Sequence, residues 1–141
     1  MCYQTILLNI KDGVAVLTLN QPERSNAVTL QMRLEILRAL DDLENDDTII
    51  AVIFTGAGRS FCSGQDVDEL KSTEGNIKLK EKAKDSILRL PRRIYGFEKP
   101  TIGAINGTAV GDGAQWVLAF DFNVASEKAK FGWIGTALGL V

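Results

Sequence analysis

One stretch of this chain, residues 99–114, constrains the fold more than any other: KPTIGAINGTAVGDGA. Apolar and β-branched residues at 101–105 predict a buried strand, and the glycines that follow predict a tight turn. A helix is expected from Asp112 onward. A strand that passes through a glycine turn into a helix points free backbone N–H groups at one place, where an anion or a polarised carbonyl is held.

A second stretch, residues 56–67, has the same order of features. It follows an apolar run at residues 49–54 that predicts a buried strand, and it leads into a short helical segment near residues 66–71. Two such turns would offer two N–H donors to one oxygen atom, which is the arrangement of an oxyanion hole.

Composition limits the classes of protein to consider. The chain has 141 residues, 45% hydrophobic and 24% charged, which predicts one domain over residues 1–141. With 16 basic and 18 acidic residues the net charge is −2, so no nucleic-acid partner is expected. No apolar run approaches the ~20 residues of a membrane span and the N-terminus does not resemble a signal peptide, so we expect a cytoplasmic protein with no membrane partner.

The chain contains no histidine. This excludes Ser-His-Asp and Cys-His nucleophiles and the common zinc ligand sets, so no metal is expected. Cys62 has Arg59 near it in sequence but no base, and we interpret it as a small buried hydrophobic residue. Chemistry in this chain would use carboxylates, amides, hydroxyls, backbone dipoles or residues of another chain.

The other expected elements alternate strands with helices. A hairpin is predicted over residues 5–19, where Asp-Gly separates two β-branched runs. Leucines at 30, 34, 37, 40 and 43 predict a helix with Thr29 as its N-cap. We also expect a helix over 77–95 that Pro91 kinks or interrupts, a buried helix over 112–119, and strands at 122–125 and 130–131. This order predicts an α/β layered domain.

Four motifs give the chain a resemblance to a known family. They are LNQPERSNA at residues 19–27, GRSFCSGQD at 58–66, KPTIGAING at 99–107 and ASEKAKFG at 125–132. In this order and spacing they resemble the crotonase superfamily of enoyl-CoA hydratases and isomerases, over almost the whole chain.

The resemblance implies a fold, a substrate and an assembly. The fold would be a crotonase-like ββα spiral core of the α/β class, with the C-terminal trimerisation helices of the family absent from this chain. The substrate would be an acyl-CoA, with coenzyme A as the thioester part of the substrate and no separate cofactor. A homo-oligomer is expected, either a trimer or a dimer of trimers.

The resemblance also implies site residues. The N–H groups of Gln65 and Asp112 would form the oxyanion hole, and Gln115 stands where hydratases of the family carry a catalytic glutamate. The residues expected to contact coenzyme A or the acyl group are Arg24, Ser25, Ala27, Gly64, Asp66, Val67, Asp68, Gly111 and Trp133.

Two positions depart from the family pattern. Gln115 replaces the first catalytic glutamate, and Gly135 stands in place of the second. A glutamine orients water but does not accept a proton at about pH 7, which argues against the two-carboxylate addition of water. Proton transfer would come from an acid beyond Val141 or from Asp112.

Structural interpretations remain beside the functional ones. Gly111 and Gly113 also suit a tight turn with close helix–strand packing. Asp112 and Asp66 also suit helix caps, because the helix dipole stabilises a carboxylate at a helix N-terminus. Arg24 is interpreted either as a solvated loop residue or as a residue that binds a phosphate of coenzyme A.

The favoured hypothesis is an acyl-CoA lyase or isomerase that stabilises an enolate. Its reaction would be hydration of 2-enoyl-CoA or migration of the double bond. The alternative is a non-catalytic acyl-CoA-binding or assembly-dependent homologue, which Gln115 and Gly135 favour. A peptidase on a related spiral fold is a third hypothesis, and the missing histidine counts against it.

Overall fold

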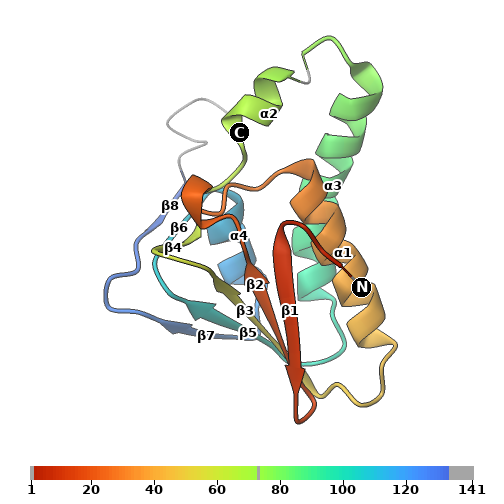
Figure 1. Cartoon of the computed structure of the whole chain (residues 1–141), viewed down its shortest axis with the longest axis vertical. Coiled ribbons are helices and arrows are strands. Elements are labelled where there is room, and N and C mark those ends of the chain that lie inside the picture. The colour runs from red at the N-terminus through yellow and green to blue at the C-terminus, as the bar shows by residue number, and fades with distance from the viewer. Residues whose placement is uncertain (1, 73, 134–141) are drawn as a thin grey trace.

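The computed structural model describes residues 2–72 and 74–133, which form two sheets with helices packed beside them (Figure 1). The larger sheet begins with a hairpin of β1 (Ile6–Lys11) and β2 (Val14–Leu19). Asp12 and Gly13 join these strands with φ angles of 51° and 79°, as a tight two-residue hairpin turn requires. The predicted hairpin is therefore confirmed.

Parallel strands extend this sheet in the order β1-β2-β3-β5-β7. From β2 onward, at least one helix lies between successive strands of this sheet along the chain, and this alternation confirms the α/β class. The added strands are β3 (Ala51–Gly56), β5 (Thr101–Ile105) and β7 (Phe122–Ala125), and the intervening helices are α1 (Leu30–Glu44), α3 (Ile77–Tyr95) and α4 (Asp112–Ala119).

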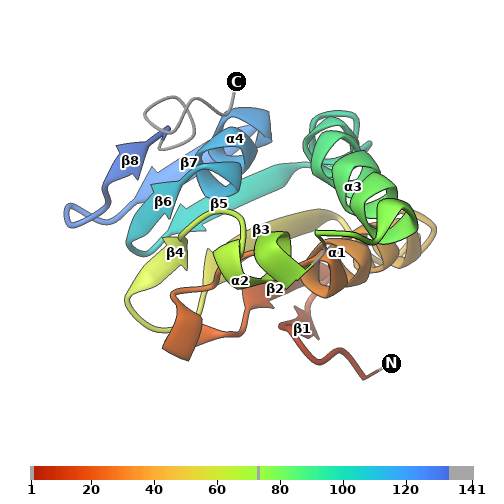
Figure 2. The same cartoon turned by 90° about the horizontal axis from the view of Figure 1, so that it is seen from above.

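A smaller, parallel sheet joins β4 (Ser60–Cys62), β6 (Thr108–Val110) and β8 (Phe131–Gly132). The sequence predicts turns in place of β4 and β6, and that prediction is wrong. Strands of three residues are too short to show a period of two, and they form because they pair with residues far away in the sequence. Figure 2 shows this sheet on the side of the molecule away from α1 and α3.

Helix α1 begins as predicted, because the Thr29 hydroxyl accepts a hydrogen bond from the N–H of Met32 at 3.2 Å. Its buried face differs from the predicted leucine stripe. Arg33 is fully buried, whereas Leu34 is only half-buried. This face therefore carries one charged side chain into the interior.

The other helices correct two predictions. Helix α3 continues through Pro91, because Leu90 and Ile94 are fully buried and their packing outweighs the lost backbone hydrogen bond. Helix α4 is buried on one face only, since Gln115 and Leu118 are exposed. The short helix predicted near residues 66–71 is confirmed as α2 (Val67–Ser72).

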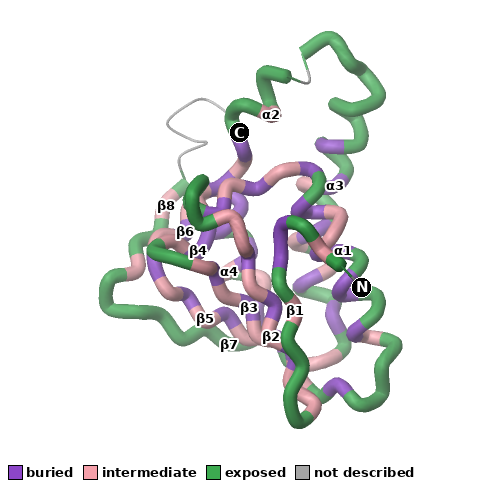
Figure 3. The backbone as a smooth tube through the Cα atoms, in the orientation of Figure 1, coloured by how far each residue is buried: buried purple, intermediate pink, exposed green. Residues whose placement is uncertain are grey.

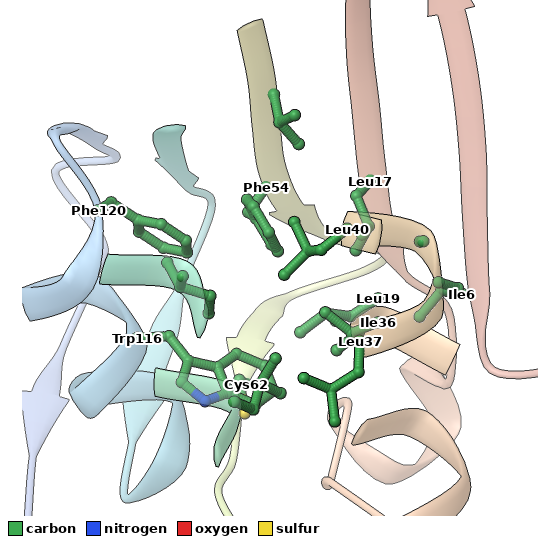
Figure 4. Packing of buried hydrophobic residues seen from close by; sticks show 14 of the residues in the cluster. Ile6, Leu17, Leu19, Ile36, Leu37, Leu40, Phe54, Cys62, Trp116 and Phe120 are labelled. Atoms are coloured by element: carbon green, nitrogen blue, oxygen red, sulfur yellow. The ribbon is translucent and has the colours of Figure 1, made fainter. Parts of the chain in front are cut away.

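The core lies between the larger sheet and the helices. Figure 4 shows Leu40 of α1, Phe54 of β3 and Phe120 after α4 directed into the same interior. The Phe54 and Phe120 rings lie with their centroids 4.8 Å apart. Figure 3 shows that burial is concentrated here, while α2 and β7 are mostly exposed. The strands and helices around the two glycine turns are thus anchored in a packed interior.

Candidate functional site

The two glycine turns meet at one edge of the smaller sheet. Gly64 follows β4 and Gly111 follows β6, and parallel pairing of β4 with β6 brings their carboxyl ends together. Both glycines adopt left-handed backbone conformations, with φ of 89° and 55°. A Cβ atom on Gly111 would lie 3.3 Å from the Cα of Gly64, so the two turns touch through their backbones.

Each turn leaves an N–H group without an acceptor among the described residues. The bridge between Val28 and Gln65 uses the carbonyl of Gly64 and the N–H of Asp66, at 2.8 and 3.0 Å, and so leaves the N–H of Gln65 unbonded. Asp112 is the first residue of α4, where an N–H has no intrahelical acceptor. Within residues 2–72 and 74–133, neither N–H donates to another group.

The sulfur of Cys62 lies between the two turns. It accepts a hydrogen bond from the N–H of Gly64 at 3.4 Å. A Cβ atom on Gly113 would come within 2.6 Å of the Cys62 Cβ, so only glycine permits this approach. Burial raises the pKa of the Cys62 thiol to about 12, which leaves it protonated and unreactive. The interpretation of Cys62 as a buried packing residue is confirmed.

The side chain of Asp112 is directed at Arg33 of α1. Its Oδ2 accepts from Nη2 of Arg33 at 2.6 Å, and the two side chains are 10% and 1% exposed. Gly111 is the N-cap residue of α4, and Asp112 makes no capping hydrogen bond in the described part of the chain. The helix-cap interpretation of Asp112 is therefore wrong. Arg33 was not among the site residues predicted from the sequence.

Two predicted site residues lie at the surface: Gln115, predicted to be catalytic, and Trp133, predicted to contact the substrate. Gln115 is exposed one turn into α4, on the helix that begins with Asp112. Trp133 directly follows β8 and is 47% exposed. Both follow strands of the smaller sheet, as the two turns do. Gly135 lies outside the described residues.

The two segments predicted to bind coenzyme A lie side by side. Ser63 donates its N–H to the carbonyl of Ser25 at 3.1 Å, and Ala27 lies in the same loop beside the bridge to Gln65. Figure 1 shows this loop next to the start of α2. The structure therefore brings the predicted loop and the first glycine turn into direct contact.

Charges on these two segments are paired with each other. Arg24 contacts Asp66 at 2.7 Å and Asp68 at 3.1 Å, and its side chain is 43% exposed. Asp66 is buried and accepts the N–H of Glu69 at 2.8 Å, so its interpretation as a helix cap is confirmed. Val67 is exposed beside it.

Two parallel strands of the smaller sheet thus end in glycine turns that touch each other. Residues 9–141 match the family model described as enoyl-CoA hydratase/isomerase. The chain belongs to this family, within the crotonase superfamily.

Relatives and solved structures agree with this membership. The chain is 39% identical over 143 residues to 1,2-epoxyphenylacetyl-CoA isomerase of Escherichia coli, covering 96% of this chain and 53% of the relative. It is 36% identical to short-chain-enoyl-CoA hydratase of Clostridium acetobutylicum, covering 96% of this chain and 51% of the relative. A solved enoyl-CoA hydratase/isomerase of Xanthobacter autotrophicus Py2 superimposes with a TM-score of 0.91 at 34% identity, covering 98% of this chain and 52% of that one.

The chain spans about half the length of the curated relatives it matches. Within that half the fold is the crotonase-like spiral core that the motifs imply. Among the described residues, no helix combines the length and the hydropathy needed to cross a bilayer.

Proposed function

We propose that this chain forms the enolate-stabilising part of an acyl-CoA lyase or isomerase. The carbonyl oxygen of a thioester would accept hydrogen bonds from the N–H groups of Gln65 and Asp112. The observation that supports the proposal is the backbone contact between Gly64 and Gly111, because each glycine precedes a residue whose N–H has no acceptor among the described residues. The expected reactions are hydration of 2-enoyl-CoA and migration of its double bond.

The chemical reason lies in the charge that develops during these reactions. Removing a proton from the carbon next to the thioester carbonyl moves negative charge onto the carbonyl oxygen. Adding the oxygen of water to the conjugated double bond, as its proton passes to a base, does the same. Donors fixed by glycine turns and by packing need no reorganisation when this charge appears, and each contributes about 3–4 kcal/mol in comparable sites. Their rigidity here comes from Cys62, whose sulfur accepts the N–H of Gly64 in the first turn and whose side chain lies directly against Gly113 after the second.

We assign proton transfer to a group outside the described residues. Gln115 has the position and the exposure to orient water or substrate, but an amide does not exchange a proton at about pH 7. The carboxylate of Asp112 is already bound to Arg33 and is held in the interior. The roles that we assign to the described part of the chain are therefore substrate binding and polarisation of the thioester carbonyl.

Coenzyme A would lie along the two joined segments. Ser25, Val67 and Asp68 are exposed and Ala27 is half-buried, on the two segments that the bridge between Val28 and Gln65 joins. Arg24 would turn its guanidinium from Asp68 to a phosphate, because that carboxylate is exposed and the ion pair is weak. Gly111 and Trp133 would border the acyl group, and no cofactor besides this substrate is required.

A second candidate is a non-catalytic acyl-CoA-binding homologue or a subunit active only within an assembly. Gln115, at the position of a family glutamate, favours it. For either candidate we propose a cytoplasmic homo-oligomer, a trimer or a dimer of trimers, as the resemblance implies.

The test is binding of a ketone-bearing CoA thioether, which cannot be hydrolysed, measured by calorimetry together with the mass in solution. Asp112→Pro removes the second donor at the first helical position, where proline fits. Asp112→Ala is the matched control, because it removes the same carboxylate and keeps the N–H. Weaker binding by the proline variant than by the alanine variant supports the oxyanion hole. Equal binding by both, or none by the folded wild-type chain, contradicts it.

The same samples separate the two candidates. Turnover of a 2-enoyl-CoA by the wild-type protein supports the enzyme. Tight binding of the thioether without turnover, in every assembly state the protein adopts, supports the non-catalytic homologue.

A further inference from the structure

In the second turn, the negative charge of the Asp112 carboxylate lies next to the backbone N–H of the same residue. Asp112 supplies a backbone N–H and a carboxylate from the same residue, so the two lie within a few bonds of each other. An unbalanced carboxylate there would repel the charge that forms on a thioester oxygen, and the repulsion is strong where water is excluded. The chain therefore needs a cation at this place if the donor is to work.

Arg33 is that cation. Its Nη2 lies 2.6 Å from Oδ2 of Asp112, and its side chain is only 1% exposed. Its Nε and Nη1 are buried and have no hydrogen-bond partner among the described residues. Asp112 is the one carboxylate in the described part of the chain that pairs with Arg33. Among the described residues, the guanidinium therefore pairs with Asp112 alone, although its Nε and Nη1 are buried without a hydrogen bond.

Stability does not account for this arrangement. A buried ion pair with unsatisfied donors costs desolvation energy that a pair of apolar side chains would avoid. An unsatisfied buried group in a folded protein calls for a separate explanation. For Arg33, the proposed chemistry supplies that explanation.

Among the residues that the structure describes, no further ion pair involves Arg33 or Asp112. Cys62 of β4 is a neutral thiol, and β6 has no ionisable residue. The buried positions of α3 are Ala83, Ser86, Leu90 and Ile94, none of which is charged. The balance of charge at the second donor therefore depends on Arg33 and Asp112.

We propose that Arg33 is a positioning residue that acts through Asp112: it cancels the carboxylate charge and so sets the electrostatic potential at the second oxyanion donor. This inference rests on the proposed function. It assigns to α1, far from the turns in sequence, a direct influence on how strongly a thioester carbonyl is polarised.

The test measures the polarisation itself. A saturated short-chain acyl-CoA, labelled with ¹³C at the thioester carbonyl, is bound to the full chain, and the infrared carbonyl frequency is compared with that of the free ligand. Asp112→Asn keeps the N–H and an acceptor for Arg33 but removes the negative charge. If charge balance governs the donor, this variant shows a larger downward shift than wild type. A pair that served only as a mechanical tie would give an equal or smaller shift.

Arg33→Met provides the opposite change. It leaves the carboxylate unbalanced, so the carbonyl shift becomes smaller, and affinity for the ketone-bearing thioether falls about tenfold, as expected for one uncompensated charge at this range. The double variant Arg33→Met/Asp112→Asn has no charge at either position, and its carbonyl shift returns to the wild-type value. If Arg33→Met does not fold, Asp112→Asn and the double variant still decide the question.

The matched control is Arg93→Met. It removes an arginine that pairs with Glu44 at the same distance of 2.6 Å, away from both turns, and should leave the carbonyl shift unchanged. A wild-type chain that binds but does not shift the carbonyl overturns the proposed function and this inference with it. A wild-type shift that stays unaltered in Asp112→Asn and in folded Arg33→Met overturns the inference alone.

Discussion

The two glycine turns share a backbone design but differ in what holds their side chains. In the first, Asp66 pairs with Arg24, which is 43% exposed, and it also caps α2. In the second, Asp112 pairs with Arg33, which is 1% exposed. The backbone donors depend in both cases on a left-handed glycine and on parallel strands.

The two turns therefore share a backbone geometry and differ in how their charged side chains are held. The first turn is held mainly by backbone hydrogen bonds to the loop around Ser25 and Val28, and its ion pair is in contact with solvent. The second turn depends on a buried pair, where water screens little. Changes of charge should therefore matter greatly at the second turn and little at the first.

Arg33→Met should have the largest effect on stability. Removing the guanidinium leaves the Asp112 carboxylate buried and unpaired, which costs about 3–5 kcal/mol. Urea denaturation measures the loss, and Asp112→Asn in the same chain should recover most of it. A loss below about 1 kcal/mol would show that the pair is more open to water than its burial indicates.

Gly113→Ala comes next. Its Cβ would lie 2.6 Å from the Cβ of Cys62, so the two turns must move apart, at a cost of about 1–3 kcal/mol. Gly132→Ala is the control, because its nearest neighbour would be a methyl group of Val110 at an ordinary 3.5 Å, and we expect a change within about 0.5 kcal/mol. Thermal unfolding of both variants checks the contrast, and equal losses would contradict it.

The Cys62 thiol gives a pH dependence of stability. Burial raises its pKa from 9.0 to about 12, so the folded chain keeps a proton that the unfolded chain releases. Stability from this group is complete below pH 9 and is lost as the pH rises toward 12. By about pH 10 the wild type should lose about 1 kcal/mol more than Cys62→Ala. If the free energy of unfolding changes equally in the two proteins between about pH 8 and about pH 10, the assignment is wrong.

Arg24→Met should have the smallest effect, because its partner Asp66 keeps the N–H of Glu69 and the arginine is partly in solvent. We expect a loss under about 1 kcal/mol, reduced further by added salt. Denaturation at low and high ionic strength measures it. A loss as large as that of Arg33→Met would remove the distinction between the two turns.

Local patterns predict most of this fold. The hairpin at Asp12 and Gly13, the helix that starts after Thr29 and the strand of residues 122–125 all follow from turn chemistry, capping and periodicity. In the smaller sheet, the strand expected at residues 130–131 is present as β8 at Phe131–Gly132. Strands β4 and β6 are not predicted, because they are short and exist only by pairing across the chain. The two turns are nevertheless visible in the sequence, since glycines mark them.

The buried cation is the part of the site that sequence reasoning misses. A helix normally turns its arginines to solvent, so Arg33 appears unremarkable beside the leucines. Its spacing from Leu30, Leu37 and Leu40 places it on the apolar face, and that is the available signal. Its partner could not be inferred, because Asp112 lies far along the chain and their contact is a product of tertiary packing.

The contact between Gly64 and Gly111 also bears on how the protein folds. The chain between them includes α2, α3 and β5, and this long loop must close before the two turns can touch. Closing it costs entropy that only the later packing repays. Helices can form early from local signals, but the pair of donors belongs to the finished structure. Capture of an acyl-CoA would therefore report completion of folding, which helix content alone does not.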